Sequence, residues 1–343
     1  MNGKNSTLTL YIPGLLGPFS HATPEVELGR YPNLQRLLSR GQHLEVGAKD
    51  YVTCVAEHFG VLLHEADTPP LAAVMRRADG FASDEAYYLL AEPVHLRADQ
   101  GKVYLDAADD LAISSEEARE LIEACNGLYA EDGWRIESFH PHRWYLRLPN
   151  APRITTAPTA EVLGCAIGDY LPWGDDGLYW HRVMNEIQML LHGQAVNQQR
   201  AARGEPAINA LWLWGGGYLP AVDSPVPQPL WSDEPWSRGL ALLSGSRLHT
   251  GATDYAGVAG EPEATVVFDE LACAMRRGDT TAWLAALERL EQAWCAPLVQ
   301  ALGKQRLGQL DIYPGNGMGL RATRKTLRRW WRRGLSYSQL LSA

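Results

Sequence analysis

The sequence predicts an α/β protein whose mainly parallel sheet is flanked by helices and carries a small inserted α+β domain. Two observations support this class. A β-prone run followed by a helix opens the chain, and short apolar runs that end in Gly or Pro alternate with amphipathic segments further along. The chain has 343 residues, which suggests two domains or one core with a large insertion. We expect the core at 1–83 and 149–343 and the insertion at 84–148.

The first predicted strand is 7–12, a β-prone run stopped by Pro13 and Gly14. The next predicted element is a helix over 31–41. Pro32 suits its first turn and Gly41 suits its C-terminal cap. The apolar face of this helix consists of Leu34, Leu37 and Leu38.

The segment 84–148 differs from the rest of the chain in its pattern of predicted strands and helices. Three short runs rich in aromatic and aliphatic residues, 87–90, 103–105 and 144–148, predict strands. Between them, 114–129 predicts a helix that is capped by Ser114 or Ser115 and carries two glutamates in its first turn. The mixture predicts an α+β insertion.

Five further elements follow the insertion. The clearest amphipathic helix is predicted over 177–192. The run 208–214 is almost continuously apolar, which is typical of a strand buried on both faces in a parallel sheet. Strands are also predicted near 265–268 and at 309–313. Between them, a helix presents an apolar face made of Trp283, Leu287, Leu290, Trp294 and Leu298.

Composition excludes several classes of protein. Hydrophobic residues make up 46% and charged residues 21%, as in globular domains with a sizeable core. No apolar run approaches the roughly 18 residues that span a bilayer, and the N-terminus shows no signal-peptide pattern, so we expect a cytoplasmic protein. The five cysteines are scattered, which favours reduced packing residues over disulfides or a zinc site.

The charge is unevenly distributed along the chain. Net charge is −9, which makes a nucleic-acid partner unlikely on physical grounds. The segment 321–333 holds seven Lys or Arg and no acid, so the other residues carry 24 basic against 40 acidic side chains. This basic, amphipathic segment predicts docking onto the acidic body of the chain or contact with a protein partner.

Several segments of the sequence resemble cofactor-independent phosphoglycerate mutases of the archaeal type, which belong to the alkaline phosphatase superfamily. These are the early helix at 32–41 and the stretch from His192 through Arg200 and Asn209 to Gly217. The phrases at 93–99, 185–192 and 211–217 resemble more closely the RpfE-type regulatory proteins of proteobacteria, which are distant relatives of the mutases. The resemblance implies an alkaline phosphatase-like core.

The resemblance also implies two divalent metal ions held by Asp and His around a Ser or Thr nucleophile, and the expected ligands are missing. The first strand ends in Ile12 and Pro13 where a metal-binding Asp is expected. Asp269 and Glu270 are not followed by a ligand His, and Tyr313 and Pro314 stand where an Asp-His pair is expected. All ten histidines lie at or before 249. We therefore expect no metal and no cofactor.

A polar stripe carries the first candidate ligand site. Side chains spaced by three and four on the helix at 177–192, with others that follow it, predict a polar pocket above the apolar strand. Arg200 could grip a carboxylate or phosphate in bidentate fashion. The alternative is that these groups cap helices and pin a loop. The residues are Asn185, Gln188, His192, Asn197, Arg200 and Asn209.

Two glycine-rich turns extend the candidate site. Gly215 and Gly217 follow the apolar strand and could bind a phosphate through backbone N–H groups, although close backbone approach is the alternative. Trp214 could form an aromatic wall or simply pack in the core. Asn316 lies in a second turn, at the expected carboxyl end of the last strand. Ligands bind at that edge in open α/β sheets.

Together these observations predict a metal-independent, non-catalytic member of the superfamily with a regulatory or ligand-binding role. The expected ligand is a phosphorylated or carboxylated small molecule. The alternative is a phosphoglycerate-mutase-like phosphotransferase or phosphoesterase with an unorthodox active site. That alternative requires Arg200 and His192 to converge with Asp254 or Asp311 on one substrate.

Overall fold

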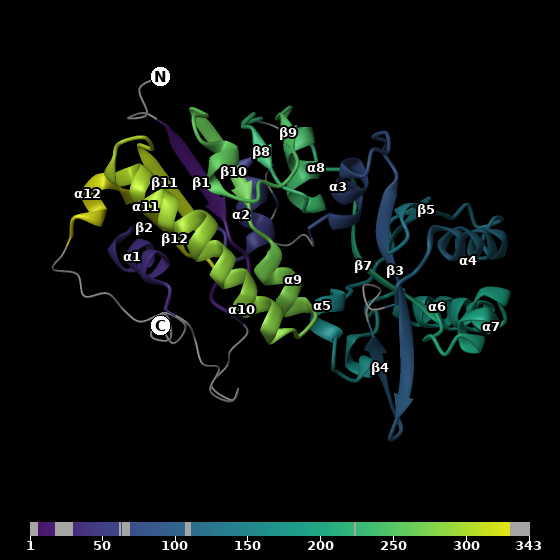
Figure 1. Ribbon diagram of the computed structural model, residues 1–343. Helices are drawn as coiled ribbons and strands as arrows, with labels where there is room; N and C mark the ends of the chain where they lie inside the picture. The colour runs from purple at the N-terminus through teal and green to yellow at the C-terminus, as the bar shows by residue number, and fades with distance from the viewer. Residues whose placement is uncertain are drawn as a thin grey trace. The chain divides into compact units, whose positions relative to one another are not determined.

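The computed structural model describes residues 6–17, 30–61, 63, 69–106, 111–222 and 224–329. The chain divides into two compact units, the first formed by 1–64 and 221–343 and the second by 65–220 (Figure 1). The second unit contains the segment 84–148 that the sequence predicts as an insertion. The unit extends beyond that segment on its C-terminal side. Strand β7 (Ala210–Gly217) pairs with β3 (Tyr87–Asp99), so β7 and the helices between 148 and 210 belong to the same unit.

The first unit is built on a seven-stranded, mainly parallel sheet, as the sequence predicts. Strands β8 to β11 and β1 run parallel, and β12 and β2 add an antiparallel edge. In spatial order the strands are β2 (Gln42–Leu44), β12 (Gly319–Thr323), β11 (Gln309–Tyr313), β1 (Thr7–Tyr11), β10 (Glu263–Val267), β8 (Leu230–Trp231) and β9 (Leu248–His249).

One face of this sheet is apolar and packs against helices. Leu8, Leu10 and their neighbours on β10 and β11 form a single buried cluster with residues of these helices. The helices are α1 (Pro32–Arg40), α9 (Glu270–Arg276), α10 (Thr280–Arg289) and α11 (Ala296–Gly303). Because side chains alternate along a strand, Thr9 and Tyr11 face the other way. There Tyr11 meets α2 (Tyr51–His58), which in turn packs against α8 (Pro235–Leu243).

The helix predicted across 283–298 is interrupted by a π-helical turn, η5 (Leu290–Cys295). The turn carries Glu291, whose carboxylate accepts hydrogen bonds from the backbone N–H groups of Asn33 (3.0 Å) and Leu34 (2.9 Å). Helix α1 has no side-chain cap of its own, so Glu291 satisfies its first N–H groups.

The second unit is antiparallel throughout its described strands. Its sheet has the order β4 (Lys102–Asp106), β3, β6 (Arg143–Leu148), β5 (Arg135–His140), and β7 also pairs with β3. The expectation that β7 belongs to a parallel sheet is therefore wrong. Its residues are apolar on both sides because helices cover both faces of this sheet.

The helices of the second unit divide between the two faces. On one face α4 (Ser115–Leu128), α6 (Gly177–His192) and α7 (Ala195–Ala202) share a buried cluster with the strands, and on the other face α3 (Leu71–Ala78) does so. Ser114 begins α4 in a capping box with Glu117, which resolves the choice between Ser114 and Ser115. The shorter helices of the chain are α5 (Thr159–Val162), η3 (Ile167–Tyr170), η4 (Tyr255–Val258) and α12 (Arg324–Leu327).

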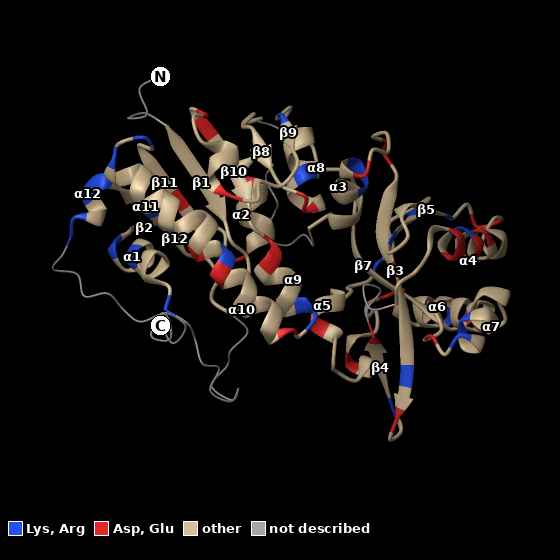
Figure 2. Cartoon of the chain, viewed as in Figure 1, with Lys and Arg blue, Asp and Glu red and all other residues tan. Residues whose placement is uncertain are grey.

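The described part of the basic segment 321–333 belongs to the first unit. Arg321 lies on β12, and Leu327 on α12 is buried in the apolar cluster. Figure 2 shows the basic residues of α12 in blue. The carbonyl oxygen of Leu327 accepts a hydrogen bond from Arg40 of α1 (2.8 Å). Residues 330–333 lie outside the described residues, so a partner bound through the whole segment stays a prediction. Among the described residues, no helix is both long enough and apolar enough to cross a membrane.

Candidate functional site

The six polar residues that the sequence groups into one pocket belong to the second unit and face different ways. Asn185 and His192 on α6 are exposed, and Gln188 is partly buried. Asn197 and Arg200 on α7 are buried. The structure therefore separates a solvent-facing set from an interior set.

The amides of Asn197 and Asn209 each bind backbone. Asn197 donates to the carbonyl oxygens of Leu191 (2.7 Å) and Ile208 (2.9 Å) and accepts from the N–H of Ile208 (2.8 Å). Asn209 accepts from the N–H of Leu96 (2.7 Å) and donates to its carbonyl oxygen (2.9 Å). These bonds tie the end of α6 and the strand β3 to the segment that enters β7, which is the loop-pinning role left open by the sequence.

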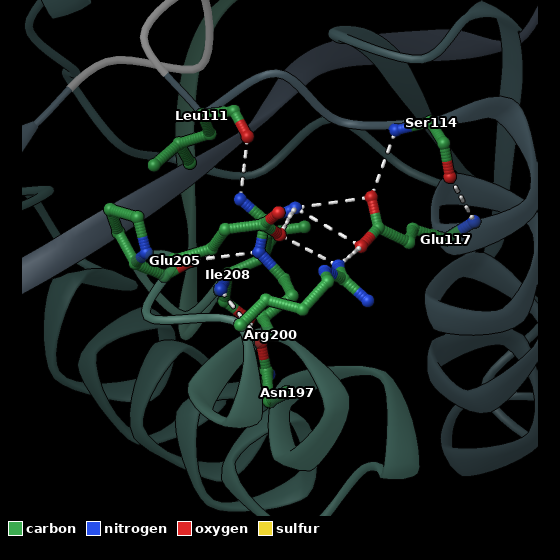
Figure 3. A network of polar contacts seen from close by, with 9 residues as sticks. Leu111, Ser114, Glu117, Asn197, Arg200, Glu205 and Ile208 are labelled. Atoms are coloured by element: carbon green, nitrogen blue, oxygen red, sulfur yellow. Dashed lines mark hydrogen bonds and ion pairs between the residues drawn. The ribbon is translucent and has the colours of Figure 1, made fainter.

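The Arg200 guanidinium is enclosed by acceptors of its own unit (Figure 3). Its side chain is 1% exposed. Nε donates to the carbonyl oxygen of Pro206 (2.7 Å), Nη2 donates to that of Leu111 (2.5 Å), and Nη1 lies 3.1 Å from both carboxylate oxygens of Glu117. All three nitrogens thus have partners inside the protein, and a ligand would have to displace one of them.

Glu117 links this network to the start of α4. Its carboxylate also accepts a hydrogen bond from the Ser114 backbone N–H (2.9 Å) and pairs with the exposed Arg203 (2.8 Å). Burial opposes ionisation of Glu117, but the Ser114 N–H and the Arg200 guanidinium outweigh it and lower the pKa of the carboxyl. The network therefore joins α4 to α7 through an ionised carboxylate.

The glycines at the end of β7 allow close packing of the start of α3. A Cβ on Gly217 would lie 2.4 Å from Cβ of Pro70, and one on Gly215 would lie 3.1 Å from Cβ of Leu71. Gly215 also has φ +63°, a conformation that favours glycine. Trp214 is partly buried and packs against the apolar clusters on both faces of the sheet. Close approach between strand and helix is a sufficient reason for these glycines.

We expect Gly217→Ala to lower the free energy of unfolding by about 1–3 kcal/mol, because the added methyl group meets the Pro70 ring. Gly127→Ala is the matched control. Gly127 lies within α4 with no atom within 4 Å of an added Cβ, so we expect a gain of about 0.5–1 kcal/mol. Urea denaturation of both variants checks this. A neutral Gly217→Ala would show that packing does not require the glycine.

The side chains that the enzymatic alternative requires to converge have other partners. Asp311 accepts two hydrogen bonds of 2.8 Å from Arg321 on the neighbouring strand. Asp254 caps η4 by accepting from the N–H of Gly257. With Arg200 enclosed as described, three of the four groups are engaged within their own units.

The other candidate region is the carboxyl edge of the parallel sheet in the first unit. Strands β1, β8, β9, β10 and β11 all end there, and open α/β sheets bind ligands at this edge. Asn316 is exposed in the turn that follows β11. Gly315 in the same turn has φ +83°, and a Cβ there would lie 3.0 Å from Cβ of Tyr51. The turn is therefore packed against the start of α2.

Aromatic side chains occupy the middle of this edge. The rings of Tyr11 at the end of β1 and Tyr313 at the end of β11 stack at 5.0 Å. Tyr11 also makes edge contacts with Tyr51 (6.3 Å) and His58 (5.5 Å) of α2. Burial raises the pKa of Tyr11 and of Tyr313, so both phenols are neutral at pH 7.

Glu234, which follows β8, is the acidic group beside these rings. Its carboxylate accepts hydrogen bonds from the backbone N–H groups of Trp236 and Ser237 (both 2.8 Å) and so caps α8. It also accepts one from the hydroxyl of Tyr51 (2.9 Å). Burial and the neighbouring Glu234 raise the pKa of Tyr51 well above its usual value. The carboxylate thus holds α2 and α8 together.

Asp269, which follows β10, is another acidic group at this edge. Its carboxylate accepts from the thiol of Cys273 (3.6 Å), and the sulfur of Cys273 accepts from Arg276 (3.0 Å). Burial raises the pKa of Asp269, and the nearby Asp233 carboxylate adds to the effect. At the end of β9, the His249 ring stacks on Trp231 at 4.3 Å.

The side chains present do not fit the pair of divalent metal ions that the resemblance implies. The Glu234 oxygens already accept from α8 and Tyr51, and Asp269 is paired with Cys273. The ends of β1 and β11 bring neutral phenols where carboxylate and imidazole ligands would be needed. Within the described ranges, no three His, Cys, Asp or Glu side chains are placed to share one metal ion.

Sequence reasoning missed the roles of Tyr51, Glu234 and His58. One signal was available for Glu234, since an acidic residue directly before Pro235 is a typical start of a helix. Tyr51 and His58 carry no such signal, because their partners Glu234 and Thr265 lie 183 and 207 residues away in the chain.

Comparison with known proteins shows homology to cofactor-independent phosphoglycerate mutases at low identity. A probable 2,3-bisphosphoglycerate-independent phosphoglycerate mutase of Geobacter sulfurreducens is 28% identical over 156 residues, which is 45% of this chain and 39% of that protein. The mutase of Methanosarcina barkeri is 34% identical over 113 residues, which is 32% of this chain and 28% of that protein. The matches thus span well under half of these relatives. No protein-family profile matches the chain.

A solved structure supports the fold over a longer stretch. A protein from Pyrococcus horikoshii superposes with a TM-score of 0.55 at 12% identity, covering 93% of this chain and 86% of that one. The chain therefore shares a mixed α/β fold with that protein, and in this chain the larger sheet is mainly parallel.

Proposed function

We propose that this protein is a phosphoglycerate mutase-like regulatory protein of the RpfE type, which binds a phosphorylated or carboxylated small molecule and does not transfer phosphoryl groups. One observation carries the proposal. At the carboxyl edge of the parallel sheet, the carboxylate of Glu234 after β8 is committed to capping α8 and binding Tyr51. Residues that hold the fold together occupy the place expected of catalytic ligands.

The enzymatic alternative, a mutase-like phosphotransferase or phosphoesterase, is favoured by one finding, the similarity to named mutases. It requires a substrate site, and three of the groups proposed for it are engaged elsewhere. Asn185, Gln188 and His192 on α6 and Asn316 at the sheet edge are not tied into such networks. They stay our candidates for ligand contact.

Assays of the purified full-length chain distinguish the two functions. We expect no interconversion of 2- and 3-phosphoglycerate and no hydrolysis of p-nitrophenyl phosphate above the buffer rate, with Mg²⁺, Mn²⁺ or Zn²⁺ added. We also expect phosphorylated or carboxylated metabolites, screened by thermal unfolding, to include at least one that raises the melting temperature. Metal-dependent turnover that is lost in Asp269→Asn would contradict the proposal and support the enzyme.

A further inference from the structure

A groove in the second unit runs between helix α4 and the edge strand β5. Its volume is about 430 Å³, and it is partly open to solvent. The residues that matter to its chemistry are Arg119, Ile122, Arg135, Ser138, Phe139 and His140. Among the described strands, β5 is the last at this edge of the sheet, and Figure 1 shows α4 beside it.

The backbone of β5 has one edge paired with β6 and the other turned to the groove. The side chain of Asn126 on α4 accepts from the N–H of Ile136 (2.7 Å) and donates to its carbonyl oxygen (3.0 Å), so those groups point away from β6. In an antiparallel pair the orientation repeats every second residue. The register of β5 on β6 is regular from Arg135 to Ser138 and shifts between Ser138 and His140, so Ser138 is the last residue to which this alternation applies, and it directs its N–H and carbonyl oxygen into the groove.

Asn126 shows how a polar group can bind the free backbone edge of β5. Its amide imitates a neighbouring strand by binding both backbone groups of one residue. The chain thus covers the first outward residue of β5 with its own side chain and leaves the next one, Ser138, to face the groove. A β edge left in this way is a template for another strand.

The walls of the groove supply an apolar contact and a positive charge. Phe139 is 66% exposed beside Ser138. Arg119 forms an ion pair with Glu123. Glu137 forms an ion pair with Arg76 at 2.8 Å. Arg135, with a 72% exposed side chain, reaches Glu137 only at 3.8 Å. The groove therefore presents one weakly compensated cation next to the strand edge.

We propose that an extended segment of a partner protein binds in this groove as an added strand on β5. Its backbone would pair with Ser138, an apolar side chain would pack on Phe139, and an acidic side chain would face Arg135. Main-chain pairing gives affinity in this mode of recognition, and the side-chain pockets give specificity. The proposal rests on the second unit alone and is independent of the function proposed above.

Selection of random dodecapeptides displayed on phage against the immobilised full-length chain tests the proposal. We expect enriched peptides that carry an acidic residue near an apolar one. In a selected peptide, N-methylation should weaken binding about tenfold or more at the positions that pair with Ser138 and have little effect at the alternate positions. No enriched peptide, or no alternation in the N-methyl series, would overturn the proposal.

Two pairs of variants test whether the peptide binds in the groove. Phe139→Ala should weaken peptide binding about tenfold, and Arg135→Glu several-fold. Leu178→Ala and Arg182→Glu, at exposed positions of α6 outside the groove, should leave binding unchanged. Binding to Arg135→Glu should recover when the acidic residue of the peptide is changed to lysine. Equal losses in the α6 variants, or dimerisation of the chain through β5 that excludes peptide, would contradict the assignment.

Discussion

Replacing Arg200 with alanine will lower the free energy of unfolding by about 3–5 kcal/mol, the usual cost of removing one partner from a buried ion pair. The change leaves the carboxylate of Glu117 and the carbonyl oxygens of Leu111 and Pro206 without their donors. Urea denaturation followed by far-UV circular dichroism measures the loss.

Arg203→Ala is the matched control for this experiment. Arg203 binds the same Glu117 carboxylate, but its side chain is 46% exposed, so we expect a cost of no more than about 1 kcal/mol. A stability of Arg200→Ala equal to that of Arg203→Ala would show that the buried network contributes little, and a ligand role for Arg200 would become the better account.

Acid will destabilise the protein through His58 before most carboxylates titrate. Burial lowers the pKa of His58 to about 4 from a usual 6.5, although Gln228 and Asp311 act in the opposite direction. The ring nitrogen Nε2 lies 2.9 Å from the hydroxyl of Thr265, which donates to the Gln228 side chain. The hydrogen-bond chain therefore favours a neutral imidazole with a proton on Nε2.

The sign of the effect follows from the lowered pKa. The unfolded chain binds the proton near pH 6.5 and the folded chain only near pH 4, so the contribution of His58 is complete above pH 6.5 and is lost as the pH falls toward 4. The loss is about 3 kcal/mol. We expect His58→Gln to remove this part of the acid sensitivity, measured as the free energy of unfolding at pH 7 and pH 4.

His43→Gln is the control for His58→Gln. His43 is exposed on β2, so its replacement should leave the pH dependence of stability as in the original protein. If the His58 and His43 variants lose stability in acid to the same extent as the unchanged chain, the buried histidine does not govern this pH range.

The fold could be predicted where local pattern and packing agree. The strand at 309–313 and the helix at 177–192 match β11 and α6, because turn residues and a one-sided apolar face mark them. The direction of β7 could not be predicted, since an apolar strand looks the same in a parallel and an antiparallel sheet. Strand β5 was missed because Arg135–His140 is mostly polar and lies at a sheet edge.

The candidate site could be predicted less well than the fold. The sequence identifies Arg200 as a side chain suited to a carboxylate, and the structure gives it the carboxylate of Glu117, 83 residues earlier in the chain. A pattern of residue types does not reveal whether such a partner belongs to the protein or to a ligand. The same holds for Glu234, whose hydrogen bond to Tyr51 depends on the tertiary fold.

Calorimetric titration of Mn²⁺ into the chelator-treated full-length chain tests most directly whether the carboxyl edge of the sheet has lost the superfamily's metal centre. Because Glu234 and Asp269 have other partners, we expect no binding tighter than about 1 mM. Two equivalents of Mn²⁺ bound more tightly than this, and lost together in Asp269→Asn and in Glu234→Gln, would contradict the account.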